Sequence, residues 1–125
     1  MVDFSFVQPT KGRRAQRVAG SIKAAVSEII LLELNNPNAG LLTVTGVRMS
    51  RDLSIANIYV SCLGSPEDRE PNLKFLKRNN RQVRRALGQR VPMKFVPEVR
   101  FFIDTTADAV QRIEDLLNHR NEPDK

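Results

Sequence analysis

Cysteine and histidine are almost absent from this chain of 125 residues, which has one of each. A lone Cys62 permits no internal disulfide bond and offers no cluster of ligands for a metal ion. The only histidine, His119, lies near a C-terminal end that we expect to fray. We therefore interpret Cys62 as a small residue on a strand and not as a nucleophile, and we predict neither a metal site nor a cofactor.

The sequence also lacks long apolar runs. No stretch approaches the ~20 residues that a membrane-spanning helix requires. Residues 1–8 mix Phe4, Phe6 and Val7 with Asp3 and other polar residues, which is not the pattern of a secretory signal peptide. We therefore expect an intracellular, cytoplasmic protein without a membrane partner. Hydrophobic residues make up 41% of the chain and charged residues 27%, a balance that favours one globular domain over a disordered chain.

Acidic residues are missing from one face of the segment from Leu73 to Leu87. At about 100° per residue, this segment forms a helix with an apolar stripe opposite a basic arc. Neighbouring like charges repel by roughly 0.2–0.5 kcal/mol per pair, so such an arc favours a polyanionic partner over a merely solvated surface. Together with the formal net charge of +6, it predicts nucleic-acid binding. The stripe consists of Leu73, Leu76, Val83 and Leu87, and the arc of Lys74, Lys77, Arg78, Arg81, Arg84 and Arg85.

Two asparagines interrupt the apolar stripe. Asn80 stands where an apolar residue is expected, next to Asn79, and asparagine competes with a helix by bonding to its own backbone. We expect a kink or break over Asn79, Asn80 and Arg81 that gives two short helices. The alternative is that Asn80 simply points to a wet edge. Gly88, with Pro92 just beyond, predicts that the second piece ends at Leu87.

Apolar residues at helical spacing predict a first helix over residues 13–34. Its first turns carry Arg13, Arg14 and Arg17, although the partial positive charge of a helix N-terminus disfavours cations there. A phosphate bound nearby would explain this placement, and screening by solvent or by the preceding arm explains it equally well. We take these arginines as a second candidate patch for RNA, with Arg51 and Lys94 at the margins.

Alternating apolar and polar residues predict three strands, of which the first two form an antiparallel hairpin with one buried face. Gly46 indicates a bulge in the first strand. Thr105 and Asp108 have the spacing of a capping box for a final helix. The predicted strands cover residues 41–49, 53–63 and 98–104, and the final helix covers 105–117. The predicted domain spans residues 13–117. It lies between a flexible arm (1–12) and a frayed tail (118–125).

The predicted order is helix, strand, strand, two helical pieces, strand and helix, which fits an α+β fold with helices on one face of a three-stranded sheet. From about Arg14 to Leu117, the residues resemble the ribosome-binding factor A family of bacteria. Arg84 and Leu87-Gly88 also sit where that family has such residues. The resemblance depends on three segments in the right order: Arg17-Val18-Ala19, residues 47–53 with Ala56 and Tyr59-Val60-Ser61, and residues 96–99 followed by Phe101 to Asp104.

The resemblance implies a type II KH-like fold with a mixed sheet and a kinked or broken central helix. It also implies a non-catalytic role in maturing the small (30S) ribosomal subunit and processing its 16S rRNA, performed by a monomer without a small-molecule substrate. Members of that family lack the GxxG loop of ordinary KH domains, and this chain lacks it too. They carry an alanine-any-glycine kink where this chain has Asn79, Asn80 and Arg81.

Other function classes remain as alternatives. A small RNA-processing hydrolase would need paired acids or acids around a metal ion. Glu98 and Asp104 are ~20 Å apart along an extended strand, and Asp52 is better explained as a turn residue, so we predict no catalysis. A general RNA- or DNA-binding module is the second alternative, because phosphate contacts do not identify the nucleic acid.

Base stacking is expected to be minor. The chain has seven aromatic residues, six phenylalanines and one tyrosine, and Tyr59, Phe75 and Phe101 fit a core or strand position better than an exposed platform. Phe102 is the best exception, although a sheet covered by helices more often buries such a residue. Recognition should therefore depend mostly on RNA shape.

Overall fold

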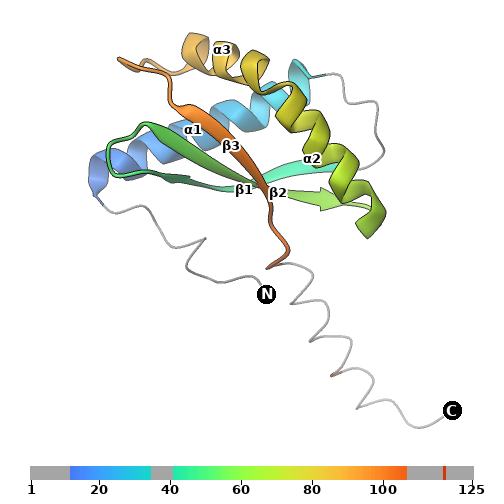
Figure 1. The fold of residues 1–125 in the computed structure, drawn as a ribbon. Coiled ribbons are helices and arrows are strands. Elements are labelled where there is room, and N and C mark those ends of the chain that lie inside the picture. The colour runs from blue at the N-terminus through green and yellow to red at the C-terminus, as the bar shows by residue number, and fades with distance from the viewer. Residues whose placement is uncertain (1–11, 35–40, 107–116, 118–125) are drawn as a thin grey trace, which may run out of the picture.

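The structure, a computed structural model, describes residues 12–34, 41–106 and 117 (Figure 1). The predicted arm apart from Gly12, the tail and nearly all of the final helix lie outside these residues. The described elements follow the predicted order, with the first helix ending two residues early and the second strand beginning two residues late. They are α1 (Arg13–Leu32), β1 (Leu41–Met49), β2 (Ile55–Leu63), the 3₁₀ helix η2 (Pro66–Asp68), α2 (Arg69–Arg78), α3 (Asn80–Arg90) and β3 (Glu98–Ile103).

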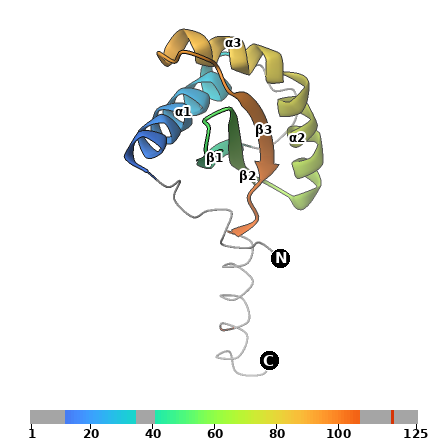
Figure 2. The same cartoon turned by 60° about the vertical axis from the view of Figure 1, so that its left-hand side comes forward.

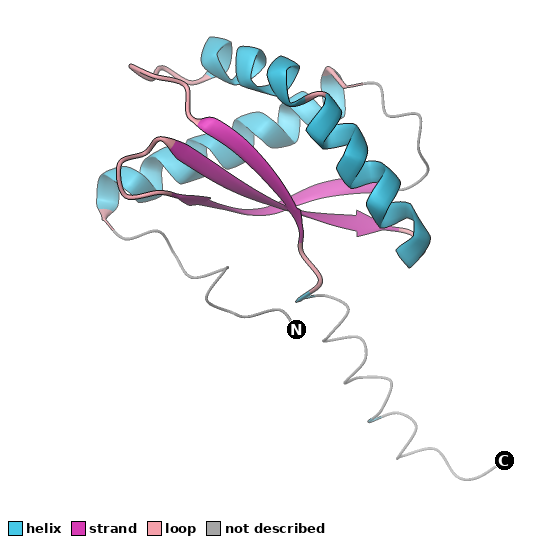
Figure 3. Cartoon of the chain, viewed as in Figure 1, coloured by secondary structure: helices cyan, strands magenta, loops and turns pink. Residues whose placement is uncertain are grey.

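The three strands form one mixed sheet in the order β1-β2-β3 (Figure 3). The hairpin of β1 and β2 is antiparallel, and β3 runs parallel to β2. Val44 pairs with Val60 and Gly46 pairs with Tyr59, so Thr45 is an extra residue in β1. This register shift confirms the predicted bulge next to Gly46.

The three described helices α1, α2 and α3 pack on the same side of this sheet, where they form an arch over it (Figure 2). The apolar stripe of α2 and α3 faces inward, because Leu76, Val83 and Leu87 are fully buried. Leu32, at the end of the apolar face predicted for the first helix, is instead exposed. The core between helices and sheet is completed by side chains from α1 and the strands, mainly Ile22, Val26, Ile29, Val44, Ile58, Val60, Val99 and Phe101.

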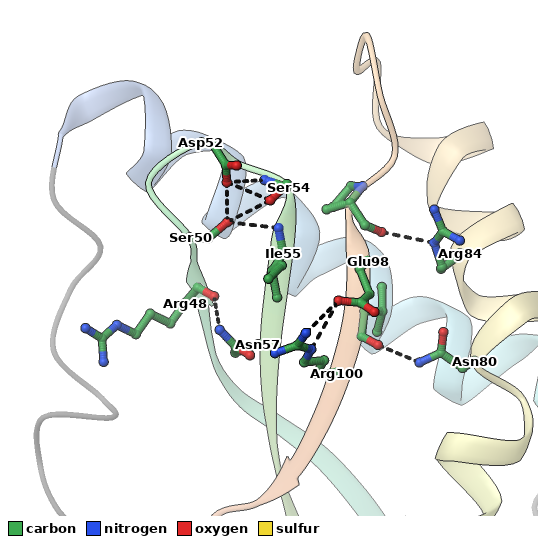
Figure 4. Close-up of polar contacts among 12 residues, drawn as sticks. Arg48, Ser50, Asp52, Ser54, Ile55, Asn57, Asn80, Arg84, Glu98 and Arg100 are labelled. Atoms are coloured by element: carbon green, nitrogen blue, oxygen red, sulfur yellow. Dashed lines mark hydrogen bonds and ion pairs between the residues drawn. The ribbon is translucent and has the colours of Figure 1, made fainter.

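The central helical segment is broken where the asparagines predicted it. Asn79 lies between α2 and α3 with φ −97° and ψ 14°, and its side-chain amide donates to the Phe75 carbonyl at 2.8 Å. Asn80 does not point to a wet edge, because its Nδ2 atom donates to the Val99 carbonyl oxygen at 2.7 Å (Figure 4). The break therefore also attaches the first turn of α3 to β3.

Gly88 does not end the second helical piece, so that prediction was wrong. The helix α3 continues to Arg90, and Gly88 lies within its last turn. A Cβ atom at position 88 would lie 2.9 Å from Cγ2 of Val96, which is closer than such atoms normally approach. Glycine fits here because a methyl group of Val96, in the segment leading into β3, lies close to the helix.

This close approach predicts opposite effects for two helical glycines. Gly88→Ala should lower the free energy of unfolding by about 1 kcal/mol, because overpacking against Val96 costs roughly 1–3 kcal/mol and exceeds the gain in helix propensity. Gly20→Ala, in α1 with no atom within 4 Å of the new Cβ, should raise it by about 0.5–1 kcal/mol. Urea denaturation measures both, and equal stabilisation by the two substitutions would contradict the close packing at Gly88.

Candidate nucleic-acid interface

The six basic side chains of the central segment all lie exposed on the outer side of α2 and α3. This follows from helical geometry, since the stripe that contains Leu76, Val83 and Leu87 is buried on the opposite side. We call the six residues the basic face. They are Lys74, Lys77, Arg78, Arg81, Arg84 and Arg85, as the sequence predicted for a nucleic-acid surface.

Three arginines of the basic face converge on one open hollow of about 560 Å³. Arg78 reaches it from the end of α2, while Arg81 and Arg85 reach it from successive turns of α3. Asn79, Gln82 and Gln89 add polar groups to the lining, which also includes the acid Glu33. Because guanidinium groups bind phosphate oxygens in a bidentate manner, this hollow has the chemistry of a phosphate site.

Glu33, the acid that lines this hollow, is already paired with Arg90. Arg90 Nε donates to Oε2 of Glu33 at 3.0 Å, and Arg90 also forms an ion pair with Glu28 at 3.3 Å. These two carboxylates, chiefly Glu33 as the acceptor of the Arg90 hydrogen bonds, raise the pKa of Arg90 above its ordinary value. Arg90 therefore joins the ends of α1 and α3 and offsets the negative charge of Glu33 beside the three arginines.

Two other members of the basic face make contacts within the fold. Lys74 pairs with Glu70 one turn earlier at 3.2 Å, and both side chains are mostly exposed. Such a surface pair contributes about 0–1 kcal/mol, so it leaves Lys74 able to exchange Glu70 for a phosphate. Arg84 donates from Nε to the Pro97 carbonyl at 3.1 Å (Figure 4). Its Nη2 atom also donates to the Val96 carbonyl at 3.3 Å. Arg84 thus fixes the segment that enters β3.

Lys77 faces a different neighbourhood from the three converging arginines. It lines a smaller hollow of about 250 Å³ together with Asn80 and with four consecutive residues of β3, Val99 to Phe102. Since α2 and α3 both contact β3, this hollow lies where the helix joint meets that strand. Within the basic face, three arginines therefore gather near the end of α1, whereas Lys77 and Arg84 lie on the side of β3.

The second candidate patch lies apart from the basic face. Arg13, Arg14 and Arg17 are exposed at the start of α1, and Arg14 lines a hollow of about 480 Å³ with Asp52, Lys94 and Phe95 among others. The helix has 20 residues and is about 30 Å long, so these arginines and the hollow beside Glu33 lie at its opposite ends. Lys94 and the exposed Arg51, which precedes Asp52 in the hairpin turn, belong to the neighbourhood of this second patch.

The three acids considered for catalysis each have a partner in the fold. Asp52 accepts hydrogen bonds from Ser54 Oγ at 2.6 Å and Ser50 Oγ at 2.9 Å, which lower the pKa of Asp52 to about 2 (Figure 4). Glu98 pairs with Arg100 at 2.9 Å, and Asp104 accepts from the Thr45 hydroxyl at 2.7 Å. Although burial opposes ionisation of Asp104, hydrogen bonds from Thr106 and Thr45 lower its pKa. All three positions are explained by turn and sheet structure.

Within the described residues, no group of three or more His, Cys, Asp and Glu side chains is placed to hold a metal ion. Cys62 lies on β2 as predicted, and burial raises the pKa of its thiol, which disfavours the nucleophilic thiolate. None of the helices described here is both long and apolar enough to cross a membrane.

A stacked pair of aromatic rings, the half-buried Tyr59 and the exposed Phe102, was foreseen from the sequence only in part. Phe75 and Phe101 are buried as predicted, and Phe102, which the sequence offered as the best exception, is 40% exposed. Its ring stacks on that of Tyr59, with centroids 5.4 Å apart. The signal was present in the alternation of β2 and β3, which places both rings opposite the core side chains.

Comparison with known proteins identifies the family. The family model described as "Ribosome-binding factor A" matches residues 14–117 of the chain. The chain belongs to the ribosome-binding factor A family. Ribosome-binding factor A of Desulforamulus reducens is 36% identical over 108 residues, which cover 86% of this chain and 90% of that relative.

Solved structures of family members share the fold. The crystal structure of ribosome-binding factor A from Thermus thermophilus is 32% identical, with a TM-score of 0.64 over 71% of this chain and 93% of that one. Coordinates of the Thermus thermophilus protein fitted into a cryo-EM map of a 30S complex are 33% identical, with a TM-score of 0.61 over 70% of this chain and 92% of that one. The α+β, type II KH-like fold with a mixed sheet, expected from the sequence, is thus confirmed.

The contacts of the basic face predict that two adjacent arginines contribute differently to stability. Arg84→Ala should lower the free energy of unfolding by about 1 kcal/mol, because the carbonyls of Val96 and Pro97 lose their donor. Arg85→Ala removes the same charge from a side chain that lines the hollow and should change stability by less than about 0.5 kcal/mol. Thermal and urea denaturation of both variants measure the difference, and equal stability would show that the Arg84 contacts are not formed in solution.

Proposed function

We propose that this protein is a non-catalytic assembly factor that binds the free small (30S) ribosomal subunit through its 16S rRNA. It acts as a cytoplasmic monomer during maturation of the subunit and processing of the rRNA. The observation that carries the proposal is the convergence of Arg78, Arg81 and Arg85 on one hollow whose acid, Glu33, is already paired with Arg90. The names of the family and of the fitted 30S complex support the choice of the ribosome as partner.

The proposed contact is made mainly with phosphates. Arginines on successive helical turns present guanidinium groups at a spacing set by the helix, so they match a folded RNA backbone better than a mobile one. Such contacts release counterions and carry little sequence information, so selectivity must come from the shape of the rRNA. Lys74 and Lys77 extend the charged surface along α2, and Arg13, Arg14 and Arg17 supply a second contact at the other end of α1.

The partners of the three candidate acids support a role without catalysis. Asp52 stays ionised at neutral pH because its pKa is about 2, so it has no proton to donate as a general acid. Glu98 forms an ion pair with Arg100, and Asp104 accepts a hydrogen bond from the Thr45 hydroxyl. Both contacts join residues within or next to the sheet.

Sedimentation with purified ribosomal particles tests the proposal. The protein should sediment with free small subunits at moderate salt and should not sediment with large subunits or joined ribosomes. Changing Arg78, Arg81 and Arg85 together to Ala should weaken binding and reduce its salt dependence by about 0.7–0.9 per lost phosphate contact.

A matched variant separates a specific surface from bulk charge. Changing Arg13, Arg14 and Arg17 to Ala also removes three positive charges, but at the opposite end of α1. We expect a smaller loss of affinity for this variant than for the triple change in the hollow. Equal binding of all particles, or equal losses from the two triple variants, would refute the proposed surface.

A further inference from the structure

The hollow of about 480 Å³ beside Arg14 forms where three segments far apart in the sequence meet. They are the first turns of α1, the turn between β1 and β2, and the segment from α3 to β3. Its described lining has an apolar floor, because Val18, Leu53 and Met93 are half-buried and pack against the core. Above this floor the lining is exposed and includes Arg14, Asp52, Lys94 and Phe95.

Phe95 places an uncovered aromatic ring at this hollow. The residue is 78% exposed, more than any other large hydrophobic residue in the described part of the chain. Nζ of Lys94 lies 5.7 Å from the centroid of the Phe95 ring, within the range of a cation–π contact. A single exposed ring is common on protein surfaces, so its neighbours decide what it can bind.

The cations beside the ring suit a ligand that carries phosphate. Arg14 and Lys94 line the same hollow as Phe95, and both side chains are exposed. Guanidinium and ammonium groups bind phosphate oxygens, whereas an exposed ring binds a flat apolar group. A nucleotide with an unstacked base has both parts, which is the chemistry of an unpaired residue in an RNA strand.

Asp52 adds a fixed acceptor to this hollow. Its Oδ1 atom accepts from Ser50 Oγ at 2.9 Å, from Ser54 Oγ at 2.6 Å and from Ser54 N at 3.1 Å, while no other described residue donates to Oδ2 (Figure 4). The hydrogen bonds lower the pKa of Asp52 to about 2, so the carboxylate is ionised at neutral pH and only accepts. They also tie together the turn in which Leu53 adopts a φ of 61°, so Asp52 is held in place before a ligand arrives.

The free oxygen of Asp52 distinguishes between bases by their hydrogen-bonding edges. Guanine has two neighbouring donors, its N1–H and its N2 amino group. Uracil has one N–H between two carbonyl oxygens, which a carboxylate repels. Adenine and cytosine each have an amino group next to a ring nitrogen that accepts. Guanine therefore fits an ionised carboxylate best.

We propose that this hollow binds one unpaired guanine of an RNA strand. The base stacks on Phe95, its N–H edge donates to Oδ2 of Asp52, and the neighbouring phosphates contact Arg14 and Lys94. This inference rests on the proposed function, because it deepens the second RNA contact at the start of α1. It gives that contact a preference for one base, which phosphate contacts alone do not provide.

Three short RNA strands test the site on the full chain. Each is a nine-nucleotide uridine strand whose central position carries guanosine, uridine or an abasic ribose. Anisotropy of the labelled strands measures their affinities. The guanosine strand should bind at least about 5-fold more tightly than the abasic strand, because it gains base stacking. It should also bind at least about 5-fold more tightly than the uridine strand, because it gains a hydrogen bond to a charged acceptor.

Substitutions separate the ring from the carboxylate. Asp52→Asn keeps a carbonyl oxygen for the bonds from Ser50 and Ser54 but replaces the free oxygen by an NH₂ donor, so the preference for guanosine over uridine should fall to about 1-fold. Phe95→Leu should reduce affinity for the guanosine strand to near that of the abasic strand, and Phe95→Tyr, which keeps a ring, should retain it. Leu32→Ala is the matched control, because Leu32 is also exposed but lies at the other end of α1. It should leave all three affinities unchanged.

The outcomes distinguish this inference from the proposed function. Equal binding of the three strands overturns the guanine site and leaves phosphate binding intact. A preference for guanosine that survives both Asp52→Asn and Phe95→Leu also overturns it. Failure of all strands to bind, with normal sedimentation on small subunits, overturns the guanine site alone. Failure of all strands to bind, together with no sedimentation on small subunits, overturns both proposals.

Discussion

The packing of α1, α2 and α3 against a single face of the sheet is the constraint on which the other features depend. It buries Leu76, Val83 and Leu87 and therefore turns the charged side of the central helices outward. The same arrangement leaves the opposite side of the strands without a cover from these helices (Figure 2). Because the helices pack on one face of the sheet, the fold has two surfaces with different chemistry. The outer side of the helices is cationic, and the opposite face of the sheet carries aromatic rings.

The basic face illustrates how identical charges acquire different roles. Arg81 and Arg85 line the hollow near the end of α1, whereas Arg84 turns to the carbonyls of Val96 and Pro97. The distinction arises from position on the helix, because residues one position apart point about 100° away from each other. Counting charges therefore overstates how many arginines are available to bind RNA. An arginine that is held by contacts within the fold, such as Arg84, is less available than one that is not.

The elements and their order could be predicted because they depend on local periodicity and on breakers such as Asn79. Two features could not be predicted because they depend on distant contacts. Gly88 lies inside α3 beside the methyl group of Val96, and Arg84 is engaged by the same returning segment. For Phe102, the alternation of β3 already separated its side of the strand from the buried side of Val99 and Phe101.

The identity of the family could be inferred from three separated segments, and the described fold agrees with it. The break between α2 and α3 occurs although this chain has Asn79, Asn80 and Arg81 where the family pattern has alanine and glycine. Here the side-chain amides of the two asparagines bond to Phe75 and Val99 and thereby stabilise the break. Hydrogen bonding at the joint replaces the small residues that the family pattern led us to expect.

The bond from Asn80 to Val99 also bears on how the sheet ends. The amides of Glu98 and Asp104 donate to the carbonyls of Ser54 and Val60, so the alternating residue Val99 directs its carbonyl to the outer edge of β3. Exposed strand edges invite pairing with a strand from another molecule. Asn80 occupies one of the acceptors that an incoming strand would need, and the helix joint stands beside it. The same joint that breaks the central helix therefore covers part of the β3 edge against pairing with another strand.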